Sequence, residues 1–228
     1  MKILAVDTAT TSCSVAIVDK TSLLSEFTLN RDQTHSKHLM DIIKAVLEMS
    51  GLNLFDLDGF AVTIGPGSFT GLRIGISTIK GLAVASEKPV VGVSSLESLA
   101  LQVSCSCDLI CPILDARKGE VYFSRYRFLN GQLKKQTRER VATPDKAVDD
   151  LNESCLFVGN GALLYKETIM EKMGKFASFA PMTQNTIRAS TLAYLSMAKF
   201  ENNDTDDVEK VIPYYIRKSD AELNLMIS

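Results

Sequence analysis

The chain has 228 residues, of which 46% are hydrophobic and 23% are charged, and its formal net charge at pH 7 is -2. This length is enough for one large domain or two small ones with a sizeable core. A net charge near zero excludes a strong field that attracts nucleic acid, so any RNA contact must be local or come from a partner.

The sequence shows no signal of membrane insertion or export. No opening apolar run follows a basic start, and no apolar stretch reaches membrane-spanning length. The five cysteines are an odd number, and Cys13 lies inside an apolar strand pattern, as expected for free thiols in a reducing compartment. We therefore expect a soluble, cytoplasmic protein without contact to a membrane.

The first hundred residues predict three strands followed by alternating helices and strands. The expected elements are strands at 2–7, 12–18 and 23–29, a helix at 36–50, a strand at 59–64, a helix at 70–86, a strand at 90–93 and a helix at 96–103. Ser94 and Glu97 form a capping box for the last helix.

From residue 108 the same order begins again. The expected elements are strands at 109–115, 120–128 and 132–140 with an Asn130-Gly131 hairpin, a helix that begins at Pro144 after the cap Thr143, a strand at 155–158 and helices at 162–173 and 189–200. The repetition predicts a duplicated α/β fold of two lobes, 1–104 and 105–228. The C-terminal helix belongs to the second lobe in this division, and the apolar tail after it docks on the body.

The most distinctive turn joins the strand at 59–64 to the helix at 70–86. It consists of Gly65, Pro66, Gly67, Ser68 and Phe69. Two glycines around a proline permit backbone angles that other residues resist, and Ser68 or Thr70 can cap the helix. The turn is either purely structural or an anion site made of free amides, and it matches neither a Walker A loop nor G-x-G-x-x-G.

The helices at 36–50 and 70–86 carry more apolar and small residues than one core contact requires. Burial in the chain's own core and a subunit interface both explain this surplus, and we favour the interface. Its candidate residues are His35, Leu39, Ile42, Ile43, Val46, Thr70, Gly71, Ile74, Gly75, Thr78 and Leu82.

Two aspartates end matching apolar strands, Asp7 in the first half and Asp115 in the second. In a duplicated α/β fold, both carboxylates can face one cleft. Alternatively, each one caps a turn, for which the aspartate side chain is well suited. The sequence leaves these two interpretations open.

Other candidate chemistry is weak. His35 and His38 lack a carboxylate that completes a metal site, and Cys105, Cys107 and Cys111 lack a fourth ligand nearby. The serines have no plausible catalytic triad. A basic stretch consisting of Lys134, Lys135, Arg138 and Arg140 is either a solvated sheet face or a local RNA contact. We expect no catalytic residue and no bound metal.

Several segments together resemble the bacterial TsaB family, also called YeaZ. They are residues 3–10, 13–16, 65–76, 91–96, 115–122 and 213–217. The resemblance covers nearly the whole chain. It implies the two-lobed actin/Hsp70/sugar-kinase (ASKHA, RNase H-like) fold, which agrees with the two lobes expected from the repeated element order.

The same resemblance implies a role in tRNA modification. Family members support a TsaD-like enzyme, as a non-catalytic subunit, in forming N6-threonylcarbamoyladenosine at position 37 of tRNAs. The implied partners are a TsaD-like subunit, a TsaE-like ATPase, tRNA through the complex, and a second copy of the chain when TsaD is absent. No cofactor is expected, and ATP or ADP would bind only weakly or within the complex.

Two departures from active relatives of the fold favour the non-catalytic role. The stretch after Asp7 contains no glycine for a phosphate loop, and His35 and His38 have the wrong spacing for the histidine pair of TsaD-type proteins. The alternative is an independent enzyme of the same fold, either an ATP-dependent kinase or a metal-dependent peptidase. A purely self-associating structural protein is a third possibility.

Overall fold

The first sheet is built from the apolar runs of the N-terminal half. The computed structural model describes residues 1–30, 35–103 and 109–217. Five strands stand in the order β3-β2-β1-β4-β5: β1 (Ile3–Asp7), β2 (Ser12–Val18), β3 (Leu23–Asn30), β4 (Gly59–Gly65) and β5 (Val90–Ser94). Every residue of β1 and β2 is buried, which explains why both strands are almost continuously apolar rather than alternating.

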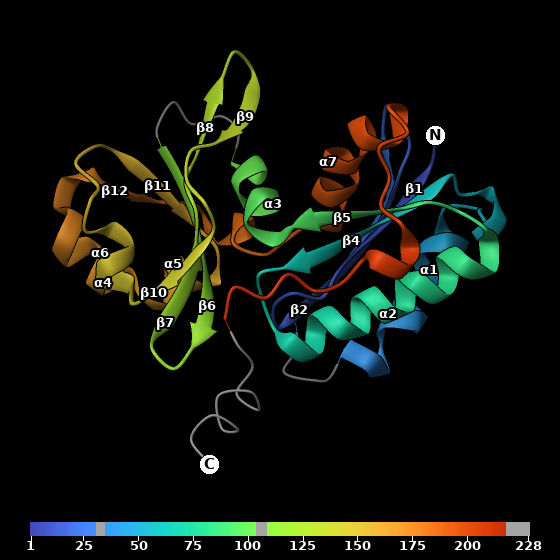
Figure 1. Cartoon of the computed structure of the whole chain (residues 1–228), viewed down its shortest axis with the longest axis horizontal. Coiled ribbons are helices and arrows are strands. Elements are labelled where there is room, and N and C mark those ends of the chain that lie inside the picture. Colours follow the sequence, from blue (N-terminus) through green and yellow to red (C-terminus); the bar gives the residue numbers. More distant parts are fainter. Residues whose placement is uncertain (31–34, 104–108, 218–228) are drawn as a thin grey trace.

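Helices cover both faces of this sheet (Figure 1). Helices α1 (Leu39–Met49) and α2 (Phe69–Ser86) lie on one face, and α3 (Ser95–Gln102) and α7 (Ala189–Glu201) lie on the other. Side chains of β1 alternate between them: Leu4 joins the core under α1 and α2, whereas Ile3 joins the core under α3 and α7. Short 3-10 turns, η1 (His35–Lys37) and η2 (Leu54–Asp56), flank α1.

The second sheet repeats this order, as β10-β7-β6-β11-β12. Its strands are β6 (Leu109–Arg117), β7 (Glu120–Phe123), β10 (Arg140–Ala142), β11 (Cys155–Val158) and β12 (Ala177–Phe179), and the hairpin of β8 (Tyr126–Leu129) and β9 (Gln132–Lys135) pairs with β6. Helices α4 (Pro144–Val148) and α6 (Lys166–Met173) pack on the outer face of this sheet, whereas α5 (Asn160–Leu164) adjoins β6. The matching strand orders confirm the predicted duplicated fold.

Some elements differ from the sequence-based expectation. The predicted strand at 132–140 divides into two at 136–139, and the predicted strand at 120–128 divides into two at 124–125, where the Arg125 side chain is buried. Its guanidinium donates to Asp150 Oδ2 at 3.0 Å and to the Ala147 carbonyl at 3.3 Å. The predicted helix at 162–173 divides at Tyr165 into α5 and α6, and strand β12 was not predicted.

The C-terminal helix completes the first lobe. Helix α7 packs on β1, β2, β4 and β5 of the first sheet, although it follows the second lobe in the chain. Beyond α7, the chain continues through η5 (Val208–Lys210), and Val211 is buried in the core under α1 and α2. The division of the chain at residue 104 stays a prediction, but these contacts place 189–201 on the first lobe rather than the second.

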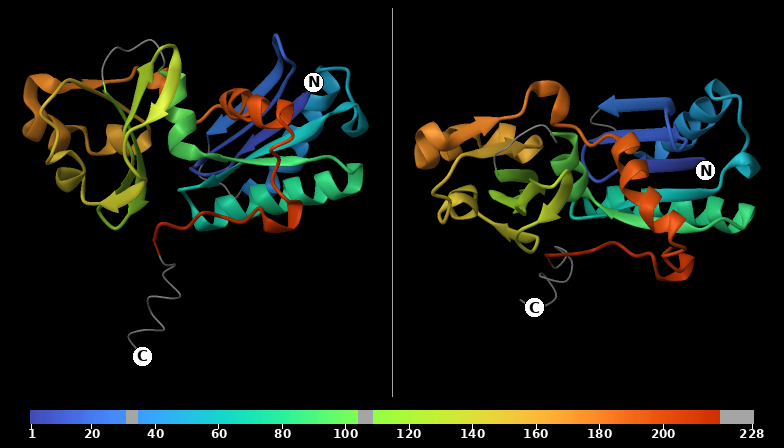
Figure 2. Two further views of the ribbon diagram at one scale, coloured as in Figure 1. Left: turned by 45° about the horizontal axis from the view of Figure 1, so that its top comes forward. Right: turned by 90° about the horizontal axis from the view of Figure 1, so that it is seen from above.

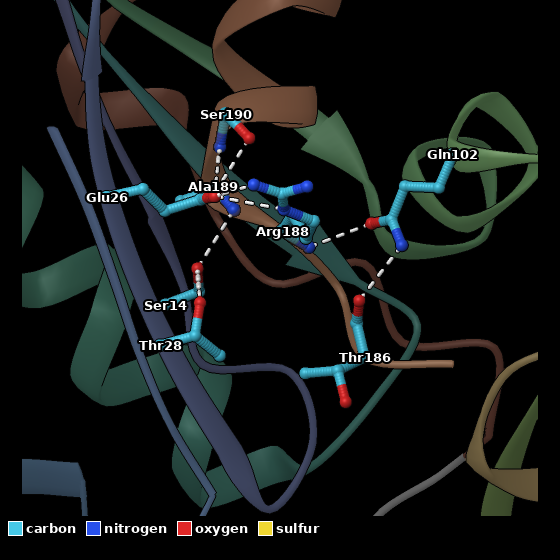
Figure 3. A network of polar contacts seen from close by, with 8 residues as sticks. All are labelled: Ser14, Glu26, Thr28, Gln102, Thr186, Arg188, Ala189 and Ser190. Atoms are coloured by element: carbon cyan, nitrogen blue, oxygen red, sulfur yellow. Dashed lines mark hydrogen bonds and ion pairs between the residues drawn. The ribbon is translucent and has the colours of Figure 1, made fainter. Parts of the chain in front are cut away.

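One side chain joins the places where the chain leaves and re-enters the first lobe (Figure 3). Gln102 ends α3, and its Nε2 donates to the carbonyls of Gln184 at 3.1 Å and Thr186 at 2.9 Å. Its Oε1 accepts from the backbone N–H of Arg188 at 2.8 Å. The returning segment is therefore held against the end of α3 by three hydrogen bonds.

The N-terminus of α7 is capped from the sheet rather than by its own sequence. Arg188, at the N-cap position, makes no side-chain cap. Instead, Ser14 Oγ accepts from Ala189 N at 3.0 Å, and Glu26 Oε1 accepts from the N and Oγ of Ser190 at 2.9 and 2.7 Å. A carboxylate at this end also interacts favourably with the helix dipole. Strands β2 and β3 therefore determine where α7 begins.

We predict that Gln102→Ala destabilises the protein by roughly 1–3 kcal/mol, since each lost intramolecular hydrogen bond contributes about 0.5–1.5 kcal/mol. Urea unfolding followed by circular dichroism measures the change. Gln136→Ala is the matched control, because Gln136 is exposed and donates to the nearby carbonyl of Lys134. Equal stability of the two variants would show that the Gln102 contacts contribute nothing.

Candidate functional site

The two candidate aspartates, Asp7 and Asp115, form the same kind of turn, one in each lobe. Asp7 Oδ1 accepts from the backbone N–H of Ala9 at 3.1 Å, and Asp115 Oδ1 accepts from the backbone N–H of Arg117 at 2.9 Å. In both cases the donor lies two residues after the aspartate, which is the geometry of an Asx turn. The turn-capping interpretation is therefore correct, whereas a shared cleft for the two carboxylates stays a prediction.

The turn after Asp7 packs directly against the start of α2. Ser68 N donates to the Ala9 carbonyl at 2.7 Å, and Thr8 Oγ1 donates to the Gly71 carbonyl at 2.8 Å. Ser68 also caps α2, because its Oγ accepts from Gly71 N at 3.2 Å. The backbone N–H groups of Ala9, Ser68 and Gly71 thus have acceptors within the chain, which favours the structural interpretation of the signature turn.

Two glycines permit this close approach. A Cβ on Gly67 would lie 2.3 Å from the Ala9 carbonyl oxygen, and a Cβ on Gly75 would lie 2.3 Å from Thr8 Oγ1. Gly65 has a φ of +123°, a conformation that residues with a side chain rarely adopt. Gly67 and Gly75 therefore permit the contact between α2 and the Asp7 turn, whereas a Cβ on Gly65 would lie 2.8 Å from the Tyr214 carbonyl oxygen.

Asp7 is fully buried, which sets its electrostatics. Burial raises the pKa of Asp7 from 3.8 to about 7, although hydrogen bonds from Ala9 and Thr63 act in the opposite direction. Among the described residues, Asp7 Oδ2 has no hydrogen-bond partner. Burial, together with the nearby charge of Asp7, raises the pKa of the Cys13 thiol to about 12. Cys13 is therefore a neutral thiol at physiological pH and no nucleophile.

Asp7 makes the stability of the protein depend on pH. Its folded-state pKa lies above the unfolded value, so its contribution is complete below about pH 4 and is lost as the pH rises towards 7. We predict that Asp7→Asn removes this dependence. Between pH 5 and pH 8 the parent should lose on the order of 3 kcal/mol of unfolding free energy that the Asp7→Asn variant does not lose.

Urea unfolding at the two pH values measures this difference. Asp41→Asn, which removes an exposed carboxylate on α1, is the control for the loss of one charge. A parent and an Asp7→Asn variant with parallel pH profiles would contradict the assignment.

Two glycines of α2 provide a second test. We predict that Gly75→Ala destabilises the protein by roughly 1–3 kcal/mol, because the new methyl group collides with Thr8. Gly81→Ala, on the same helix, meets nothing within 4 Å and should stabilise it by about 0.5–1 kcal/mol through higher helix propensity. Thermal unfolding of both variants measures the effects, and equal melting temperatures would contradict the packing described for Gly75.

The predicted interface residues separate into two groups. Six of them face the interior and cannot meet a partner: Leu39, Ile42, Ile43, Val46, Gly71 and Gly75. For these six the prediction is wrong, because the apolar arc of α1 and the small residues at the start of α2 pack on the chain's own sheet and on the Asp7 turn. Thr70 is exposed, and Ile74, Thr78 and Leu82 are half-buried. The His35 side chain lies outside the described residues.

Helix α2 nevertheless exposes a continuous face, here called the outer face of α2. It consists of Thr70, Arg73, Ser77, Gly81, Val84 and Ala85. Val84 is 68% exposed, and nothing lies within 4 Å of the position of a Cβ on Gly81. The spacing of three and four residues places all six on one side of the helix. The sequence signal for this face is the row Ser77, Gly81 and Ala85, which the candidate list omitted.

The other candidate sites gain little support. Among residues 1–30, 35–103 and 109–217, no three His, Cys, Asp or Glu side chains come together as metal ligands. Cys105 and Cys107 lie outside the described residues, and Cys111 is buried in β6. None of the helices in the described ranges has the length and apolar character needed to cross a membrane.

The basic stretch of the second lobe is partly neutralised. Lys135 pairs with Glu139 at 2.9 Å, and the Arg140 guanidinium lies 5.0 Å from the centre of the Phe123 ring. Lys134 and Arg138 are exposed. This arrangement favours the interpretation of the stretch as a solvated sheet face.

Comparison with known proteins relates this geometry to a family. Residues 22–225 match the family described as TsaD, tRNA N6-adenosine threonylcarbamoyltransferase. The chain is 32% identical over 225 residues to the tRNA threonylcarbamoyladenosine biosynthesis protein TsaB of Bacillus subtilis, an alignment that covers 97% of this chain and 96% of that protein.

Solved structures agree with the sequence relatives. YeaZ from Pseudomonas aeruginosa matches with a TM-score of 0.82 and 28% identity, over 94% of this chain and 99% of that chain. The ROK hexokinase of Thermus thermophilus matches with a TM-score of 0.50 and 12% identity, over 87% of this chain and 100% of that chain, and shares the fold alone. The fold is therefore of the predicted ASKHA type, and the chain belongs to the TsaB (YeaZ) family.

Proposed function

We propose that the chain is a non-catalytic subunit that binds and supports a TsaD-type enzyme in forming N6-threonylcarbamoyladenosine at position 37 of tRNAs. Its relatives are named for tRNA threonylcarbamoyladenosine biosynthesis, and as a member of their family it takes part in that pathway. The catalytic groups reside in the partner, and this chain contributes a binding surface.

One observation carries the non-catalytic assignment. Kinases and ATPases hold phosphates with free backbone amides at turns and helix starts. Here, Ala9 N donates to Asp7, and Ser68 N donates to the Ala9 carbonyl. The first-lobe turn is therefore packed against α2 and satisfied internally, which leaves these amides no capacity for a phosphate.

The partner surface in this proposal is the outer face of α2. Its small residues Ser77, Gly81 and Ala85 let a second helix approach closely, and the exposed Val84 adds apolar area. The match of this chain to the TsaD family supports a partner with a related fold. The same face pairs two copies of the chain when the enzyme is absent.

We predict that Gly81→Arg and Ser77→Arg each weaken binding to the TsaD-type protein of the same organism by roughly 100-fold or more, since a bulky charge at an interface centre costs several kcal/mol. Both positions are exposed, so the isolated variants should fold normally. Isothermal titration calorimetry measures the affinity, and light scattering after size exclusion measures the oligomeric state of each variant alone.

Tyr194→Arg is the matched control for this experiment. Tyr194 is 65% exposed on α7, which covers the opposite face of the first sheet. If Tyr194→Arg disrupts the complex and the two α2 variants bind normally, the partner binds the side of the first lobe that carries α7. That result would contradict the proposed role of the outer face of α2.

An independent kinase or peptidase of the same fold is the competing function. We predict no calorimetric signal at micromolar concentrations when Mg-ATP or Mg-ADP is titrated into the isolated chain, because the amides at the Asp7 turn are already bonded. A saturable signal that disappears in Asp7→Asn and Asp115→Asn variants would favour the enzyme.

The remaining parts of the proposal concern the assembled complex. A TsaE-like ATPase joins it, tRNA contacts this chain only through the complex, and nucleotide is held there rather than by the isolated chain. The net charge of -2 supports a minor role of this chain in binding a polyanion. We place the complex in the cytoplasm.

A further inference from the structure

The C-terminal segment runs along α2 and is anchored to the first lobe. Val211 is 4% exposed within the core under α1 and α2. Lys80 Nζ, on α2, donates to the Glu209 carbonyl at 2.9 Å. Tyr214 N donates to the Ile64 carbonyl of β4 at 2.7 Å. The segment therefore follows a defined path on the surface of the first lobe.

An aromatic contact fixes this segment at the start of α2. The Tyr215 ring stacks on Phe69, with ring centres 4.4 Å apart and planes inclined by 12°. The Tyr215 hydroxyl accepts from Arg73 Nε at 2.9 Å. Stacking and a hydrogen bond to a charged donor hold the tyrosine at both its ring and its hydroxyl.

Two residues later the chain contacts the other lobe. Arg217 Nη1 lies 3.0 Å from Glu120 Oε2 and donates to the Ala116 carbonyl at 3.3 Å. Ala116 and Glu120 belong to the β6–β7 hairpin of the second sheet. The Arg217 side chain is 18% exposed and that of Glu120 is 34% exposed, so water screens this ion pair only in part.

The contact lies on the side of the molecule away from the segment that returns from the second lobe to α7. In the right-hand view of Figure 2, the segment that returns from the second lobe to α7 lies at the top, and the C-terminal segment lies at the bottom. The Gln102 hydrogen bonds hold the upper side, and one hydrophobic core runs through both lobes, with Ile3 in the first and Tyr126 in the second. Rotation about that side would separate α2 from the β6–β7 hairpin.

We propose that residues 214–217 form a strap that fixes the angle between the two lobes. Tyr214 and Tyr215 attach the strap to β4 and α2, and Arg217 attaches it to the β6–β7 hairpin. The strap prevents rotation about the connected side, so the two lobes form one rigid body. This inference concerns the isolated chain and is independent of the proposed function.

The test is a distance measurement between the lobes by pulsed electron paramagnetic resonance. Spin labels are placed at Glu48→Cys on α1 and Glu171→Cys on α6, both exposed positions, in a background with Cys105→Ser and Cys107→Ser. The native thiols Cys13, Cys111 and Cys155 are buried. Dilution of the labelled chain with unlabelled chain removes distances between copies.

We expect a narrow distance distribution in the parent and a broader one with a longer mean in Arg217→Ala and in Glu120→Gln. The double variant should be no broader than either single variant, because both changes break the same ion pair. Tyr215→Ala, which releases the other end of the strap, should produce the same broadening.

Arg117→Ala is the matched control, since Arg117 lies in the same hairpin, is 79% exposed and pairs with Asp115 of its own strand. Circular dichroism of each variant verifies folding, and Glu120→Gln keeps the side-chain volume. If Arg217→Ala and Glu120→Gln keep the narrow parental distribution, the strap does not fix the lobes. Equal broadening by Arg117→Ala would likewise reject the specific role of Arg217.

Discussion

Most features of this chain depend on the contact between the Asp7 turn and the first turn of α2. Two hydrogen bonds in opposite directions, from Ser68 N to the Ala9 carbonyl and from Thr8 Oγ1 to the Gly71 carbonyl, hold the helix against the strand end. The contact orients α2 and therefore its outer face. In the same contact the backbone N–H groups of Ala9 and Ser68 find acceptors within the chain, although free N–H groups at such turns are the ones that bind anions in other proteins.

The two lobes use the same turn in different surroundings. Asp7 is fully buried and carries a raised pKa, whereas the Asp115 side chain is 15% exposed and pairs with Arg117. Burial of a carboxylate is unfavourable unless hydrogen bonds offset it, and Ala9 and Thr63 supply two of them. A helix start packs against the turn in both lobes: α2 contacts the Asp7 turn, and in the second lobe Asp115 N donates to Asn160 Oδ1, at the start of α5, at 3.2 Å.

The sequence predicted the element order and the duplication well, because hydrophobic period and turn residues are local signals. It did not show which side of an apolar helix faces the chain's own sheet: Gly75 and Gly81 are the same residue on one helix, yet only Gly75 meets a neighbour. The break at Arg125 was equally hidden, since its partner Asp150 lies 25 residues further along. Contacts between distant segments decided each of these points.

The position of α7 has a consequence for how the chain folds during synthesis. Ser14 accepts a hydrogen bond from an α7 residue that lies 175 positions later in the chain, and Glu26 accepts one from a residue 164 positions later. On the face that α3 and α7 share, the part of the first sheet under α7 therefore stays uncovered until nearly the whole polypeptide has left the ribosome. Such long-range closure slows folding and leaves apolar surface open to chaperones in the meantime. The N-terminal half is thus finished last, although it is made first.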